Sequence, residues 1–321
     1  MDIPDDVKRK VEQFKIEKHP KSICIANYKG GVGKTTVTTL LGYYLAHRGY
    51  KVLLFDIDPQ CSLSLAVGYD PEVVNKTDFT IYHLVKPKRW STITKVKFRQ
   101  YIDDVPDAYA PDTLKIIKGS FDVDELDIIV TRELVENPSA ETMLFGYCTN
   151  MLNEFTDFDY ILVDCPPNKM YLTQAMLRAC SYYLAVTIPD KISIFGMPRL
   201  LRWVKEIDEK SRPKFLGCVL NGINRAGGYE YGTQNQQRAT EELYDSIKKE
   251  LTSVERKIIE THPIIERIPR LDVISRFLSQ GADKMAWFDF RHQSSEQKSV
   301  ADIMMNFTNR IENRIKDYAK A

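Results

Sequence analysis

Chemistry in this chain is concentrated in a glycine-rich segment that ends in lysine and threonine. Residues 29–36 read Lys-Gly-Gly-Val-Gly-Lys-Thr-Thr, after the apolar run 23–26 and before the apolar-periodic stretch 37–48. A buried strand, a glycine turn and a helix in this order are typical of a phosphate-binding loop, because backbone N–H groups can surround phosphate oxygens where no Cβ intervenes. The helix start adds unpaired donors and a positive dipole end. The segment therefore predicts a nucleoside triphosphate site.

Each position in this loop has an expected role. The Lys34 side chain is expected to reach the β- and γ-phosphates, and the Thr35 hydroxyl is expected to take a place on Mg²⁺. The predicted nucleotide contacts within the loop are Lys29, Gly30, Gly31, Val32, Gly33, Lys34, Thr35 and Thr36.

Two further apolar strands end in carboxylates. Residues 51–55 run into Asp56 and Asp58, and strand alternation places these two acids on the same side of the chain. Residues 160–163 run into Asp164, and the two prolines that follow stop the strand. Carboxylates at the ends of parallel strands can support Mg²⁺ and orient an attacking water. The sequence predicts an α/β P-loop NTPase with a doubly wound, mostly parallel sheet flanked by helices.

The loop differs from the common pattern, which begins with a glycine where this chain has Tyr28, followed by Lys29. In this it resembles the ParA/MinD family of P-loop ATPases, closest to ParA/Soj-type partitioning ATPases, whose deviant Walker A motif reads KGGxGK[ST]T. The resemblance implies that Lys29 reaches across an ATP-bound homodimer to the partner subunit's phosphates. ATP binding and dimerisation would then be one event. It also assigns Asp58 to the attacking water, and Asp56 and Asp164 to the surroundings of Mg²⁺.

The same resemblance indicates residues near the base. Residues 215–221 form an expected strand that ends in Asn221, and residues 268–270 resemble the family's Ile-Pro-Arg segment. Asn221 and Pro269 are therefore expected to flank the adenine, although Asn221 could instead simply begin the turn that follows. The expected catalytic residues are Lys29, Lys34 and Asp58, and the expected metal ligands are Thr35, Asp56 and Asp164.

The resemblance implies a slow ATPase that works as a switch. With ATP such proteins dimerise and bind DNA non-specifically, and a ParB-like partner stimulates hydrolysis and releases them, which partitions plasmid or chromosomal DNA. The expected DNA contacts are Arg225, Arg270 and Arg276, with Val273 where relatives carry a further basic residue. Arg225 could also be an ordinary surface arginine in a glycine-rich turn. We expect a cytoplasmic, nucleoid-associated protein.

Composition favours one sizeable domain. The 321 residues include 45 Lys and Arg and 44 Asp and Glu, so any DNA contact must come from a local patch. The acidic N-terminus does not resemble a signal peptide, and six cysteines without close pairs favour reduced thiols. We expect an N-terminal helical extension over 1–20 and a single ATPase domain over 21–321. Within that domain we expect a basic insertion at 86–99 and a C-terminal helix at 298–319.

Several alternatives stay open. The run 86–99, with Trp90 and no acid, could contact phosphates or be a solvated loop. The amphipathic helix 298–319 could bind a membrane as in MinD, but its acids favour packing against the core, so a membrane partner is not expected. A helix is also expected over 198–209. The alternative functions are a ParA-like positioner of a protein cargo, a MinD-like membrane-associated positioner, and a metabolic P-loop enzyme, against which Lys29 argues.

Overall fold

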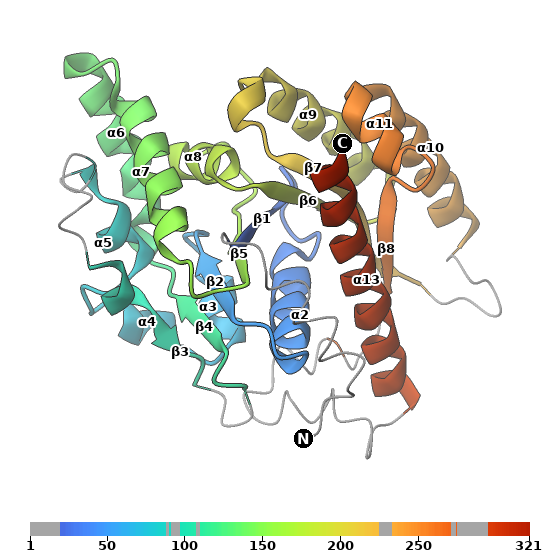
Figure 1. Cartoon of the computed structure of the whole chain (residues 1–321), viewed down its shortest axis with the longest axis horizontal. Coiled ribbons are helices and arrows are strands. Elements are labelled where there is room, and N and C mark those ends of the chain that lie inside the picture. Colours follow the sequence, from blue (N-terminus) through green and yellow to red (C-terminus); the bar gives the residue numbers. More distant parts are fainter. Residues whose placement is uncertain are drawn as a thin grey trace.

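The computed structural model describes residues 20–87, 90, 97–106, 110–224, 233–270, 274 and 295–321. Its centre is an eight-stranded sheet (Figure 1). In chain order the strands are β1 (Lys21–Ala26), β2 (Val52–Asp56), β3 (Asp103–Asp104), β4 (Leu114–Ile117), β5 (Tyr160–Asp164), β6 (Tyr182–Thr187), β7 (Lys214–Ile223) and β8 (Ile264–Pro269). They lie in the order β3-β4-β2-β5-β1-β6-β7-β8, and only the pair β3 and β4 is antiparallel.

The central strands are apolar because helices cover both faces of the sheet. Strands β1, β2 and β5 are buried along their whole length, as expected for parallel strands without a solvent-facing side. From β1 the chain builds one side of the sheet through β2 and β4, then returns and builds the other side through β6, β7 and β8. This doubly wound arrangement confirms the predicted fold class.

The helices form one layer on each face of the sheet (Figure 1). Helices α2 and α13 pack on one face, and α7, α8, α9 and α10 pack on the other. The helices are α2 (Lys34–His47), α3 (Ser62–Ala66), α4 (Pro71–Val74), α5 (Ile81–Val85), α6 (Glu125–Glu136), α7 (Ala140–Glu154), α8 (Tyr171–Ala179), α9 (Lys191–Glu206), α10 (Gln234–Glu250), α11 (Ser253–Ile259) and α13 (Ser295–Lys320), with 3-10 turns η3 (Phe98–Tyr101), η4 (Phe121–Asp124) and η5 (Glu209–Ser211).

Helix α9 begins earlier than its sequence pattern predicted. The expected start was residue 198, but the helix begins at Lys191 and Pro198 lies inside it. The side chain of Asp190 caps the helix by accepting a hydrogen bond from the N–H of Ser193. The prediction was wrong because it took the proline as a helix start, whereas the cap lies eight residues before it.

Helix α13 is part of the core. Phe307, Ile311 and Ile315 are at most 1% exposed, and they pack with side chains of α2 and the sheet. The guanidinium of Arg314 and the hydroxyl of Tyr318 donate hydrogen bonds to backbone carbonyls of β7. The apolar stripe of this helix is therefore covered by protein. Within the described ranges, we find no helix with the length and apolarity needed to cross a membrane.

Some predicted features lie outside the described residues. They are residues 1–19 of the N-terminal extension, positions 88–89 and 91–96 of the basic insertion, and the arginines at 225 and 276. Trp90 is described, and its indole packs in the core with its N–H donating to the carbonyl of Val85 at 2.7 Å. Phe98, the other aromatic residue of the basic run, belongs to the same buried cluster, so neither ring is available to a surface ligand.

Candidate nucleotide site

The glycine loop connects β1 to α2 in a conformation that requires glycine. Gly31 and Gly33 have φ angles of 72° and 94°, in the left-handed region where residues with a Cβ are strained. A Cβ on Gly33 would also stand 2.0 Å from Nδ2 of Asn221. Gly33 is therefore needed both for its backbone angle and for the close approach of the Asn221 side chain.

Asn221 connects the far side of the sheet to the loop. It lies near the carboxyl end of β7, and its Nδ2 donates a hydrogen bond to the backbone carbonyl of Val32 at 3.0 Å. The two residues are 189 positions apart in the sequence. The structure thus places this predicted base contact against the loop itself, where its amide fixes the loop conformation.

Lys34 and Thr35 occupy the start of α2. Lys34 is only 7% exposed, and its Nζ donates to the backbone carbonyl of Lys29 at 3.2 Å. Burial lowers the pKa of Lys34, and the nearby carboxylate of Asp164 opposes that shift. The Oγ1 of Thr35 donates to Oδ2 of Asp164 at 2.6 Å. A buried cation, a hydroxyl and a carboxylate therefore meet at the end of the loop.

Thr38 is a contributor that the sequence reasoning missed. Its Oγ1 lies 3.3 Å from Oδ1 of Asp164 and also donates to the carbonyl of Lys34. Its position three residues after Thr35, on the same helix face, was the available signal.

The predicted acids lie at the carboxyl ends of β2 and β5. Asp56 and Asp164 are register partners on these adjacent strands. Burial raises the pKa of Asp164 to about 8, and the charge of Asp56 adds to the shift. Burial also raises the pKa of Asp56 to about 6, although the N–H and Oγ of Ser64 both donate to its Oδ2 at 2.7 Å. Both carboxyl groups are difficult to ionise in this buried place, and a cation bound beside them would stabilise their ionised forms.

The acids differ in what they can do. Asp56 is turned toward Ser64, so Asp164 is the carboxylate that contacts the Thr35 hydroxyl. Asp58 is 9% exposed and its Oδ1 accepts the backbone N–H of Gln60 at 2.9 Å, which leaves the other oxygen, Oδ2, for a further ligand. Ser64 was not predicted, and no local pattern in the sequence marks it.

Mg²⁺ fits the donors present here. Within the described ranges, no three His, Cys, Asp or Glu side chains are grouped so that they could hold a metal by themselves. Mg²⁺ does not need such a group, because it keeps several waters and takes phosphate oxygens with one or two protein ligands. The Thr35 hydroxyl and the Asp164 carboxylate are hard oxygen donors of this kind, next to the loop.

Lys29 points away from its own loop. Its Nζ lies 3.2 Å from Oδ2 of Asp190 and donates to Oγ of Ser193 at 2.7 Å, at the start of α9. The Lys29 side chain is 32% exposed. Sequence reasoning missed Asp190 and Ser193, although an aspartate three residues before a serine is a recognisable helix cap.

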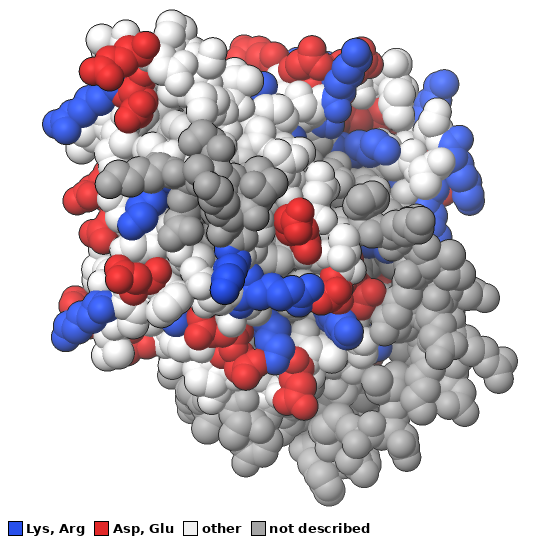
Figure 2. Space-filling model, turned by 60° about the vertical axis from the view of Figure 1, so that its left-hand side comes forward, with Lys and Arg blue, Asp and Glu red and all other residues white. Residues whose placement is uncertain are grey.

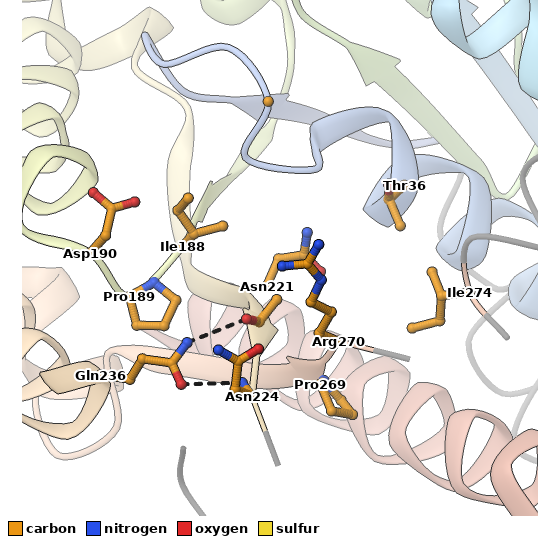
Figure 3. A pocket seen from close by; sticks show the side chains of 12 residues that line it. Thr36, Ile188, Pro189, Asp190, Asn221, Asn224, Gln236, Pro269, Arg270 and Ile274 are labelled. Carbon is orange, nitrogen blue, oxygen red and sulfur yellow. Dashed lines mark hydrogen bonds between the residues drawn. The ribbon is translucent and has the colours of Figure 1, made fainter. Parts of the chain in front are cut away.

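A cavity of about 440 Å³ opens beside the loop (Figure 3). Four predicted site residues line it together with Arg270: these are Gly31, Thr36, Asn221 and Pro269. Gln236 closes one side, since its Nε2 donates to the carbonyl of Gly222 and its Oε1 accepts the N–H of Asn224 (Figure 3). Arg270, predicted as a DNA contact, lies in the cavity wall beside Asn221 (Figure 3).

A family model matches the part of the chain that carries the glycine loop and the acidic strand ends, and several known proteins are similar to the chain. The AAA domain family matches residues 20–216, which is more than half of the chain. The chromosome-partitioning ATPase Soj of Treponema pallidum is 32% identical over 188 residues, covering 58% of this chain and 64% of that protein. A protein described as replication protein A from Rhizobium rhizogenes is 33% identical over 181 residues, 56% of this chain. The match spans only 43% of that relative's length.

Solved structures share the fold over most of the chain. An ATP complex of a McdA variant from Cyanothece has a TM-score of 0.67 at 16% identity, covering 94% of this chain and 98% of that one. MinD from Pyrococcus horikoshii, complexed with Mg-ADP, has a TM-score of 0.59 at 19% identity, covering 91% and 96%. At these identities the likeness concerns the fold. The family match shows that the chain belongs to the AAA domain family, and this match, the Soj relative and the glycine loop together identify it as a P-loop ATPase of the ParA/MinD type.

Proposed function

We propose that this chain is an ATPase switch that dimerises on ATP, binds DNA non-specifically and is reset by partner-stimulated hydrolysis. The observation that supports it best is the different placement of the two lysines of the loop. Lys34 is buried at the phosphate end of the loop, whereas Lys29 extends outward to Asp190. A P-loop uses one lysine for its own phosphates, so the second is available to the phosphates of another subunit.

The chemistry assigned to the site uses residues in contact with one another. Lys34 and the backbone N–H groups of the loop bind and orient the phosphates. Thr35 and Asp164 would hold Mg²⁺, which would neutralise charge on the phosphate oxygens. Asp58 orients the attacking water through the oxygen that does not accept from Gln60. ATP and Mg²⁺ as cofactors are supported by the ATP complex of the McdA variant and the Mg-ADP complex of MinD.

The dimer surface is proposed to include the start of α9. Ile192 and Phe195 are 76% and 78% exposed, and both lie within five residues of Asp190. Two exposed apolar side chains beside a lysine that points outward are suited to burial against a second copy of the chain. This arrangement supports a homodimer that forms across the nucleotide.

DNA binding by this chain would depend on a local basic patch that the dimer doubles. On the face drawn in Figure 2, acidic and basic side chains lie interspersed, and the net charge of the chain is +1. A face of mixed charge binds the phosphate backbone weakly, whereas a dimer doubles any basic patch and makes its affinity for DNA depend more steeply on salt. The kinship with the chromosome-partitioning ATPase Soj supports DNA as the partitioned cargo. A ParB-like stimulating partner is what the resemblance of the loop to the ParA/MinD motif implies.

The same mixed charge supports a second candidate, a ParA-like positioner of a protein cargo. Its ATP chemistry would be the same and its partner would differ. A membrane-associated positioner is less well supported, because the apolar stripe of α13 is packed against α2 and the sheet.

A gel shift on random-sequence DNA tests the proposal. We expect retention with ATP only, with loss at higher salt and in Lys29→Ala. Lys257→Ala, on the exposed side of α11, is the control for loss of one positive charge. An ATP-dependent dimer that never binds DNA would replace the DNA function with the protein-cargo function. Absence of an ATP-dependent dimer would overturn the switch itself.

A further inference from the structure

A second cavity lies at the amino-terminal ends of strands β6 and β7, whereas the nucleotide site lies at their carboxyl ends. It has a volume of about 450 Å³ and is lined by Tyr182 and Lys214, the first residues of β6 and β7. The nucleotide cavity is lined instead by Ile188, just after β6, and by Asn221, near the end of β7. The two cavities are therefore separated by the length of these strands, and the family's nucleotide chemistry does not explain the second one.

Positive charge dominates this second cavity. Four cationic side chains line it, and the lining residues that the structure describes include no carboxylate; the four are Arg178, Lys210, Arg212 and Lys214. The nearby acid Asp208 does not line the cavity, and its side chain accepts the backbone N–H of Lys210 at 2.9 Å and caps η5. Thr149 and Ser181 add hydroxyl groups to the wall.

The contacts of these cations neutralise little of the charge. Arg178 is 3.5 Å from Oε1 of Glu141 and lies over the ring of Phe145. The Nε and Nη2 of Arg212 donate to backbone carbonyls of residues 205 and 207, which leaves the charge of the guanidinium unpaired by these contacts. The Nζ of Lys214 lies over the ring of Tyr318 at 5.6 Å.

One buried donor in the wall has no acceptor. The Nε of Arg178 is buried and forms no hydrogen bond. A buried charged donor without an acceptor is unfavourable, because it has lost its water and gained nothing in return. The position of Arg178 in the last turn of α8 suits its charge, since cations are favoured near the negative end of the helix dipole, but it does not supply the missing acceptor.

We propose that this cavity is a second anion site that takes a phosphate-bearing ligand. Phosphate oxygens are strong acceptors that match both the guanidinium and the ammonium donors of these four side chains. The volume is that of a small-molecule pocket, and several phosphate charges would offset the cations that line it. The ligand is a small polyphosphate anion rather than duplex DNA. A small anion can enter the hollow between α7 and β7, whereas the convex sugar-phosphate backbone of a duplex fits it less well.

Inorganic pyrophosphate is the probe for this site. The full chain carrying Lys34→Ala, which disables the phosphate loop, is titrated by calorimetry at low salt. We expect saturable binding of about one pyrophosphate per chain. Adding Lys210→Gln and Lys214→Gln should weaken it at least about tenfold, or ~1.4 kcal/mol. The control pair Lys51→Gln and Lys257→Gln removes the same charge at exposed lysines that do not line the cavity, and should weaken binding less than about twofold.

Two further measurements separate the remaining explanations. Arg178→Lys keeps the charge but replaces the planar guanidinium with an ammonium group, and it should also weaken pyrophosphate binding. The proposal is overturned if pyrophosphate does not bind saturably, or if the control pair weakens binding as much as the cavity pair. Binding of a short DNA duplex through Lys210 and Lys214, without pyrophosphate binding, would overturn the small-ligand assignment. Because Lys29 and the dimer play no part, this outcome is independent of the switch function.

Discussion

The amine of Lys29 lies 3.2 Å from the carboxylate of Asp190, and this contact holds the lysine outside its own phosphate loop. The two side chains are 32% and 39% exposed. An ion pair this accessible to solvent is typically worth about 0–1 kcal/mol. It therefore orients Lys29 toward α9 without resisting its transfer to a stronger anion. The phosphates of a nucleotide held by another subunit would be such an anion.

Separate roles for the two loop lysines predict different defects. Lys34→Ala should weaken nucleotide binding on the order of 100-fold, because it removes charge-assisted hydrogen bonds to phosphate. Lys29→Ala should change nucleotide affinity less than about threefold, since its amine is engaged with Asp190, but should abolish the ATP-dependent dimer. A fluorescent nucleotide measures the first effect and light scattering after gel filtration measures the second. Equal loss of nucleotide affinity in both variants would contradict this division.

The close contact between Gly33 and Asn221 predicts that an alanine at position 33 lowers nucleotide affinity and stability, whereas an alanine at an uncrowded glycine does not. Gly33→Ala places a Cβ at φ 94° and 2.0 Å from Nδ2 of Asn221, so nucleotide affinity and thermal stability should both fall. Adding Asn221→Ala removes the clash but leaves a backbone strain of about 1–2 kcal/mol. Thermal unfolding and nucleotide titration of the single and double variants measure both parts.

Gly146 is the matched control for that experiment. It lies within α7, and a Cβ there would meet nothing within 4 Å. Gly146→Ala should therefore stabilise the protein by roughly 0.5–1 kcal/mol through helix propensity. If Gly33→Ala behaved like Gly146→Ala, the loop conformation described here would be wrong.

Asp58 is predicted to be needed for hydrolysis and not for binding. Asp58→Ala should keep ATP affinity and the dimer, and should lose phosphate release by at least about 100-fold if it orients the attacking water. Phosphate release and gel filtration with ATP measure both properties. Asp112→Ala, at an exposed position, serves as the control. Normal turnover in Asp58→Ala would remove this residue from the catalytic assignment.

Local sequence patterns predicted the sheet and the loop because the conformation of each depends mainly on residues that are adjacent in the sequence. Apolar runs that end in Asp56 and Asp164 predict buried strands with acids at their carboxyl ends, and the two strands lie side by side. The loop was predicted from glycines whose positive φ angles only glycine adopts without strain. These elements needed no knowledge of distant contacts.

Contacts between distant parts of the chain were not predictable from such patterns. Lys29 and Asp190 are 161 residues apart, and they meet only because β6 lies next to β1. The turn of Asp56 toward Ser64 depends on how α3 follows β2. Trp90 appeared to belong to a basic surface run, but its burial is decided by helices from elsewhere in the chain. In each case the deciding partner comes from packing, which local periodicity does not encode.

The buried carboxyl of Asp164 predicts a pH dependence in the protein without nucleotide or metal. Its pKa is raised to about 8 in the folded state, mainly by burial, from the ordinary value of 3.8. Between these values the folded state binds more protons than the unfolded state, so stability should fall as pH rises. Asp56, with its pKa at about 6, acts in the same direction over the lower part of that range.

Asp164→Asn tests this directly, because the amide does not ionise. Between pH 6.5 and 8 the melting temperature of the wild type should fall, while that of Asp164→Asn should fall less. A one-unit difference in pKa corresponds to about 1.4 kcal/mol, or about 2 °C in a chain of 321 residues. The comparison is made in EDTA by thermal unfolding, with the exposed Asp112→Asn as the control. Melting curves of Asp164→Asn that run parallel to the wild type at both pH values would show that Asp164 is already ionised in the folded protein.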